Sequence, residues 1–136
     1  MIYKIFYLLL IYNFAFANNY ELKLYEKVLP SIFKEIPIKV FADKDTHVLL
    51  EHSNKFHIVS KCDKAVILLI GKRFDNIPIQ CKDKPIFATS YRSYKNSVNS
   101  FGAFYWRKGR PQLKFKNEVL EKYNLNLPFS LQKYVK

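Results

Sequence analysis

The chain has 136 residues, of which 23 are Lys or Arg and 11 are Asp or Glu, so its formal net charge is +12. This length corresponds to one domain. Apolar residues make up 49% of the chain and only 3 residues are Gly, so a packed core is expected. The composition excludes disordered chains, collagen-like rods and multi-domain enzymes.

The first seventeen residues have the pattern of an export signal. Lys4 supplies a basic start, an apolar run extends from Ile5 to Phe16, and Ala15-Phe16-Ala17 ends it with small residues where signal peptidase requires them. An uncleaved membrane anchor is the alternative, but this run of about 12 residues contains Asn13, whereas a membrane span needs about 20. We therefore expect a periplasmic protein, cleaved after Ala17, with residues 18–136 as its single domain.

The mature chain begins with an amphipathic pattern. Apolar residues recur at three- and four-residue steps from Asn19 to Glu35, which predicts a helix there. Pro30 predicts a kink or a division into two shorter helices, because proline lacks an amide hydrogen. Pro37 then ends the helical pattern.

Strand and helix patterns alternate through the rest of the chain. Ile38 to Ala42 and His57 to Ser60 read as strands, on either side of a helix from about His47 to Asn54 that Asp43 to Thr46 would cap. The unbroken apolar run from Ala65 to Ile70 predicts a strand buried on both faces. A further strand follows from Ile86 to Thr89, and a polar connection from Ser90 to Asn99.

The C-terminal part reads as a hairpin and two short helices. Ala103 to Arg107 and Gln112 to Lys116 flank the turn-forming Lys108-Gly109-Arg110-Pro111. Asn117 to Tyr123 and Pro128 to Val135 read as helices. The predicted fold class is therefore α/β, a small and mostly parallel sheet flanked by helices, with a C-terminal antiparallel β-hairpin.

Cys62 and Cys81 are the only cysteines, and they test this arrangement. Each lies just before an apolar strand, so in a parallel pair both would sit at the same end of the sheet. Neighbouring strands lie about 4.8 Å apart, which suits the Cα separation of a disulfide. In an exported protein we therefore expect a Cys62–Cys81 bond rather than a metal site or a nucleophile.

The C-terminal half resembles the YfiR-like periplasmic proteins over roughly Cys62 to Val135. The segments that carry the resemblance are Cys62 before a buried strand, Lys84-Pro85-Ile86-Phe87-Ala88-Thr89, Gly102-Ala103-Phe104, Leu113-Lys114-Phe115-Lys116-Asn117 and Leu125-x-Leu127-x-x-x-Ser130-Leu131. The resemblance implies a small α/β protein that binds the periplasmic domain of an inner-membrane diguanylate cyclase and represses it. Envelope conditions or redox state would release the cyclase.

Other polar residues give weak signals. His47, His52 and His57 recur at five-residue steps, which on a helix do not converge on one face, so no metal site is expected. Asp43 and Asp45 are the one close carboxylate pair in a loop, and helix capping explains them. No catalytic or phosphate-binding motif is present, so we expect neither enzymatic activity nor a cofactor.

Aromatic and cationic residues are interleaved from Tyr91 to Arg110. Such a segment can stack on rings and pair with carboxylates or phosphates. We expect Arg92, Tyr94, Arg107 and Arg110 to contact a partner, with Arg92 and Tyr94 on a connecting loop. Strand alternation predicts that Tyr105 and Arg107 face outward, while Phe104 and Trp106 pack inward. Ordinary solvated surface is the alternative.

These patterns favour an exported interaction protein that regulates a membrane signalling protein. The alternative is a periplasmic binding module for a small anionic ligand, held at the carboxyl ends of the parallel strands. Export argues against nucleic acid as a partner, although the charge would allow it. A homodimer and a secreted hydrolase are further possibilities.

The export signal makes a direct prediction. Exported protein should begin at Asn18, because the apolar run before it is too short to span a bilayer. N-terminal sequencing of protein recovered from the periplasm measures this. Retention of Met1 in membrane-bound protein would show instead that the segment is an anchor.

Overall fold

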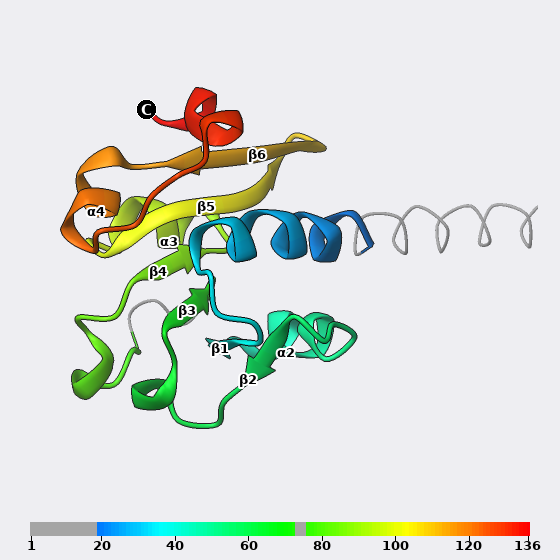
Figure 1. Cartoon of the computed structure of the whole chain (residues 1–136), viewed down its shortest axis with the longest axis vertical. Coiled ribbons are helices and arrows are strands. Elements are labelled where there is room, and N and C mark those ends of the chain that lie inside the picture. Colours follow the sequence, from blue (N-terminus) through cyan, green and yellow to red (C-terminus); the bar gives the residue numbers. More distant parts are fainter. Residues whose placement is uncertain (1–18, 73–75) are drawn as a thin grey trace, which may run out of the picture.

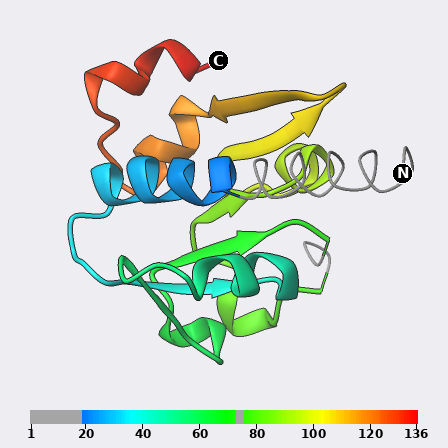
Figure 2. The same cartoon turned by 90° about the vertical axis from the view of Figure 1, so that its right-hand side faces the viewer.

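The computed structural model describes residues 19–72 and 76–136, and its elements form one six-stranded sheet with helices and turns on both faces (Figures 1 and 2). The strand order is β2-β1-β3-β4-β5-β6. The first five strands are parallel, and β6 is antiparallel to β5. The predicted fold class is confirmed, whereas the predicted signal segment 1–17 lies outside the described residues.

The elements occur near their predicted places, with boundaries shifted by a few residues. The strands are β1 (Ile38–Ala42), β2 (Phe56–Ile58), β3 (Ile67–Ile70), β4 (Ile86–Ala88), β5 (Ser100–Arg107) and β6 (Arg110–Phe115). The helices cover 19–32, α2 (Lys44–Leu50), α3 (Tyr91–Asn96) and α4 (Asn117–Lys122), and 3-10 turns cover η1 (Cys62–Lys64), η2 (Ile79–Cys81) and η3 (Phe129–Tyr134).

The N-terminal helix 19–32 packs across one face of the sheet. Tyr25 and Leu29 are fully buried there, and Tyr25 meets Phe87 and Phe104 edge-on. Pro30 was expected either to kink the helix or to divide it into two. The helix is not divided, because it continues past Pro30 to residue 32. Pro30 lies in its last turn, where the missing amide hydrogen costs one hydrogen bond and the helix ends two residues later.

The opposite face of the sheet is covered by short turns, which a disulfide joins. Leu68 and Ile70 of β3 point to this side and pack with Ile86 of β4 in a small second core. That core is closed by Cys62 of η1 and Cys81 of η2, which are both buried and bonded to each other, with 6.0 Å between their Cα atoms. The predicted disulfide is thus present, and it joins the two short turns that cover the middle of the sheet.

The predicted polar connection after β4 contains a helix, α3, which the sequence reading missed. Ser90 begins it, because the Ser90 hydroxyl accepts the Ser93 amide hydrogen at 3.1 Å. This is the usual N-cap interaction. α3 packs on β4 and β5 on the same face as the disulfide, where Tyr94 contacts the small cluster of Ala88, Ala103 and Tyr105.

Loss of the disulfide should destabilise this second core. The bond closes a loop between two cysteines that are 19 residues apart in the sequence. Replacing Cys62 or Cys81 by Ser opens this loop, and the higher conformational entropy of the unfolded chain lowers the stability by about 3 kcal/mol. The free energy of unfolding in urea, measured without reductant, should fall by roughly this amount. Reductant should destabilise the wild type similarly and leave the variants unchanged, whereas two titratable thiols in denatured, unreduced wild type would contradict the bond.

Candidate functional site

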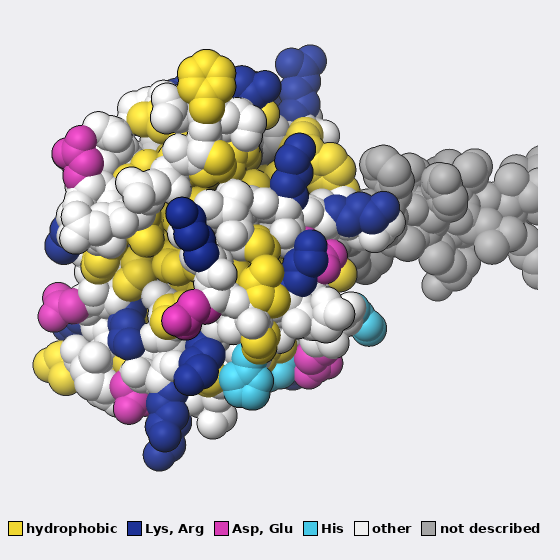
Figure 3. All heavy atoms as spheres, in the orientation of Figure 1, with side chains coloured by type: hydrophobic (Ala, Val, Ile, Leu, Met, Phe, Trp, Pro, Cys, Tyr) yellow, Lys and Arg dark blue, Asp and Glu magenta, His cyan; other side chains and the backbone are white. Residues whose placement is uncertain are grey.

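Positive charge is concentrated in one segment of the chain. Residues 84–117 contain eight Lys or Arg residues and no Asp or Glu, whereas the whole chain has 11 acidic residues. This segment includes β4, α3, β5 and β6. Figure 3, which views the face covered by the N-terminal helix, shows Lys and Arg side chains over much of the molecule, several of them toward the end where the hairpin projects. Within this segment, Lys84 lies at the other end of the strands, where it donates to the Asp63 and Ala65 carbonyls.

Arg107 and Arg110 face each other across the hairpin. They form the last cross-strand pair of β5 and β6, so their side chains share one face of the ribbon. The turn between them is only Lys108 and Gly109, which have φ angles of 51° and 75°. Positive φ at both positions is typical of a tight two-residue hairpin turn. The predicted four-residue turn was therefore too long, because Arg110 and Pro111 belong to β6.

Arg92 and Tyr94 lie on α3 and not on a loop as predicted. Tyr94 is half-buried, and burial raises the pKa of its phenol. The Lys116 ammonium lies 4.3 Å from the centre of the Tyr94 ring and donates a hydrogen bond of 2.8 Å to the Tyr94 carbonyl. Burial lowers the pKa of Lys116. Tyr94 is thus held by the end of the hairpin.

Tyr105 connects α3 to the hairpin tip. It was expected to face solvent with Arg107, but it is only 5% exposed, because α3 covers this side of β5. Its ring lies 5.6 Å from the ring of Tyr91, and the Lys114 ammonium lies 5.7 Å from its centre. Tyr91 is half-exposed. Tyr105 is therefore buried beneath α3, and Tyr91 and Arg107 are the exposed residues on either side of it.

We call this surface the basic face. It consists of Arg92 and Tyr94 on α3, Tyr91 and Tyr105 at the contact with β5, and Arg107, Arg110 and Lys114 on the hairpin. Arg92, Tyr94, Arg107 and Arg110 were predicted from the sequence as partner contacts. Lys114, and Lys116 next to the face, were not predicted, because their contacts with Tyr105 and Tyr94 depend on strand register and on helix α3.

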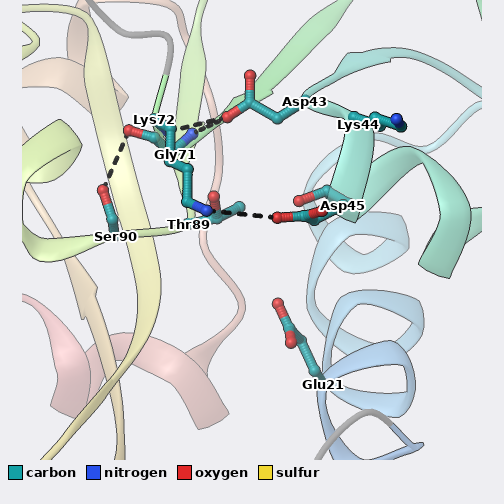
Figure 4. A pocket seen from close by; sticks show the side chains of 9 residues that line it. Glu21, Asp43, Lys44, Asp45, Gly71, Lys72, Thr89 and Ser90 are labelled. Atoms are coloured by element: carbon teal, nitrogen blue, oxygen red, sulfur yellow. Dashed lines mark hydrogen bonds and ion pairs between the residues drawn. The ribbon is translucent and has the colours of Figure 1, made fainter.

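A cavity of about 330 Å³ lies at the carboxyl ends of β1, β3 and β4 (Figure 4). Its lining residues are Glu21, Asp43, Lys44, Asp45, Thr46, Gly71, Lys72, Thr89 and Ser90. The strand order reverses between β1 and β3, and α/β sheets place ligands at such a point. The site expected by the alternative hypothesis therefore has a cavity in the expected place.

Asp43 holds the ends of two strands together at this cavity. It is 8% exposed, and its Oδ2 atom accepts hydrogen bonds of 2.6 Å from the Gly71 amide and 3.0 Å from the Lys72 amide. Asp43 occupies the N-cap position of α2, as predicted, but its side chain makes no cap bond to the helix. A side chain on Gly71 would overlap the Thr89 hydroxyl, which explains the glycine.

The charges of the cavity do not suit an anion. Glu21 comes from the N-terminal helix and accepts a hydrogen bond of 2.7 Å from the Tyr25 hydroxyl, and burial raises the pKa of Glu21. Lys72 pairs with Asp45 at 3.7 Å, and both are exposed. Three carboxylates thus face two lysines, and this balance disfavours a phosphate-like ligand.

The three histidines do not form a cluster. His47 on α2 pairs with Glu51 at 3.0 Å, while His52 follows α2 and His57 lies on β2. Among residues 19–72 and 76–136, no group of three His, Cys, Asp or Glu side chains is placed to hold a metal ion. Within the same residues, no helix is long and apolar enough to cross a membrane.

Comparison with known proteins yields a likeness of fold alone. No protein-family model matches the chain, and no curated protein matches it. A solved structure described as a conserved domain protein from Vibrio cholerae has a TM-score of 0.58 and 9% sequence identity. The match covers 85% of this chain and 60% of the Vibrio chain. At this identity the similarity concerns the α/β architecture and carries no function.

The half-buried Glu21 makes a pH prediction. Burial raises its pKa above the usual 4.5, so the protein is destabilised once the pH rises through the raised value and the carboxyl ionises. Glu21→Gln keeps an acceptor for Tyr25 and removes the charge. The variant should be more stable than wild type in urea at pH 7.5 and equal to it near pH 3.

The matched control is Glu35→Gln, because Glu35 is exposed. It should leave stability unchanged at both pH values. A Glu21→Gln variant that is less stable than wild type at pH 7.5 would show that the ionised carboxylate is stabilised in the folded protein.

Proposed function

We propose that this protein is an exported, non-enzymatic interaction protein that uses the basic face to bind an acidic surface of a periplasmic partner. The proposal joins the predicted export signal to the resemblance to YfiR-like regulators. The partner it implies is the periplasmic domain of an inner-membrane signalling protein, such as a diguanylate cyclase. The observation that carries the proposal is the run of eight cations without a carboxylate in residues 84–117.

The chemistry of the basic face supports a protein partner. Arginine and tyrosine dominate the energetics of many interfaces, because they combine a rigid apolar body with a polar end. Here Tyr91 and Arg92 are exposed on α3, and Arg107 and Arg110 are exposed on the hairpin. The positive charge of these residues would make association fast and sensitive to salt.

The rigidity of the basic face also supports this role. Tyr94 and Tyr105 are held between α3 and β5, and Lys114 and Lys116 lie over their rings. A surface that is ordered before binding loses less conformational entropy when it binds. The disulfide-bonded turns cover the same side of the sheet and keep its strands in place.

The experiment is a pull-down from detergent-solubilised envelope extract. The variant Arg92→Ala, Arg107→Ala, Arg110→Ala should retrieve the membrane signalling protein at least tenfold less well than wild type, since anchor residues typically contribute about 2 kcal/mol each. The matched control is Lys61→Gln, Lys64→Gln, Lys82→Gln, which removes three exposed charges near the amino ends of β3 and β4. It should bind like wild type.

A correctly folded triple variant with unchanged retrieval and salt dependence would place the interface elsewhere. The second candidate function, a binding module for a small ligand, is favoured by the cavity at the carboxyl ends of the strands. If wild type retrieves no protein but its melting temperature rises by several degrees with a small anion, this function replaces the first. The carboxylates of Glu21, Asp43 and Asp45 weigh against that outcome.

A further inference from the structure

The tip of the β5–β6 hairpin carries an exposed aromatic pair. Trp106 was expected to pack inward, but it is 42% exposed, because only the first turn of the described N-terminal helix reaches it. Its ring lies 5.9 Å from the ring of Tyr20, which is 40% exposed, and 5.8 Å from the buried ring of Phe104. Trp106 thus packs on Phe104 and Tyr20, and the rest of its ring is exposed to solvent.

The hairpin projects beyond the rest of the sheet. β4 pairs with β5 only as far as Ala103, so the ribbon from Phe104 to Arg107 has β6 as its single strand neighbour. At about 3.3 Å per residue, this ribbon extends roughly 13 Å past the last β4 contact, Ala103. The tip and the start of the N-terminal helix lie on the same side of the molecule in both views (Figures 1 and 2).

Three cations lie at the turn next to Trp106, and two of them, Arg107 and Arg110, project from the other face of the ribbon. Arg107, Lys108 and Arg110 are all exposed at the turn, and no residue of β5 or β6 is acidic. The carboxylates on the same side of the sheet have partners within the protein. Glu21 accepts from Tyr25, Asp43 accepts from two backbone amides, and Asp45 pairs with Lys72.

We propose that this tip, defined as Tyr20, Trp106, Arg107, Lys108 and Arg110, docks on the surface of an anionic phospholipid bilayer. Trp and Tyr rings favour the boundary between headgroups and acyl chains, because one end of each ring is polar and the other apolar. Lys and Arg beside them bind anionic headgroups. The tip combines both chemistries at one projecting end.

The position of the export signal favours lipid over protein as the occupant of the tip. Two residues separate the apolar run Ile5–Phe16 from residue 19, and Tyr20 is the second described residue. While the predicted export signal holds the chain at the membrane, Tyr20 is the tip residue closest to it in the sequence. Docking by the tip would keep the mature domain at the membrane where the proposed signalling partner resides.

The test uses Trp106 itself, which is the only tryptophan of the chain. Exported wild-type protein is mixed with vesicles of phosphatidylcholine alone or with added phosphatidylglycerol. Only the anionic vesicles should shift the tryptophan emission to the blue, and lipids brominated near the headgroup should quench it. The response should weaken as salt is raised, because the attraction is screened.

The variant Arg107→Gln, Lys108→Gln, Arg110→Gln tests the cations. Each cation near an anionic bilayer contributes about fivefold to the partition coefficient, so the variant should bind the anionic vesicles about a hundredfold less tightly. Lys61→Gln, Lys64→Gln, Lys82→Gln is again the matched control. Because it removes the same charge near the amino ends of β3 and β4, at the opposite end of the strands from the tip, its binding should fall much less.

Three results would overturn the proposal. The first is that anionic vesicles do not change the tryptophan emission. The second is that the protein sediments with vesicles but brominated lipid does not quench its emission. The third is that the tip variant and the control lose vesicle affinity equally. The tip shares Arg107 and Arg110 with the basic face, but the vesicles contain no protein, so this test measures lipid docking separately from the proposed function. If wild type retrieves a protein partner but does not bind vesicles, the tip belongs to the interface with that partner. This result would overturn lipid docking and leave the proposed function standing.

Discussion

The burial of β3 on both faces is the constraint on which the rest of the structure depends. All four residues Ile67–Ile70 are buried, and their side chains alternate between two separate cores. An apolar strand in the middle of a parallel sheet requires cover on each side. The larger core is covered by the N-terminal helix, α2 and α4, whereas the smaller one has no long helix above it.

The disulfide explains how the smaller core is closed. η1 and η2 are turns of three residues each, too short to be stable by themselves. Bonding Cys62 to Cys81 makes them one unit, which packs on Leu68, Ile70 and Ile86. α3 then covers the neighbouring part of the same face, over Ala88, Ala103 and Tyr105. Disulfides of this kind persist in oxidising compartments.

The difference in strand length separates the two candidate sites. β3 and β4 are short, so their carboxyl ends stop early and form, with Asp43, the walls of the acidic cavity. β5 has eight residues and continues past them into the basic hairpin. The molecule thus presents an acidic hollow and a basic projection on the same side. A partner or surface that engages the projection would lie close to the cavity.

The sequence by itself determined the fold class, the buried central strand and the cysteine pairing. These follow from local patterns: an unbroken apolar run from Ala65 to Ile70, and two cysteines placed alike before two apolar strands. The interleaved cations and aromatic residues also marked the segment from Tyr91 to Arg110. Such signals are read from neighbouring residues and do not depend on what lies across the sheet.

Only the tertiary structure decided which of these side chains are exposed. Alternation along β5 separates Tyr105 from Trp106, but it cannot say which face is covered. α3 buries Tyr105, and the N-terminal helix leaves Trp106 half-open, so the predicted orientation of the two was reversed. Likewise Asp43 looks like a helix cap in sequence, yet it binds the amides of Gly71 and Lys72, 28 and 29 residues away. Exposure and long-range hydrogen bonds are set by packing between elements that are distant in the chain.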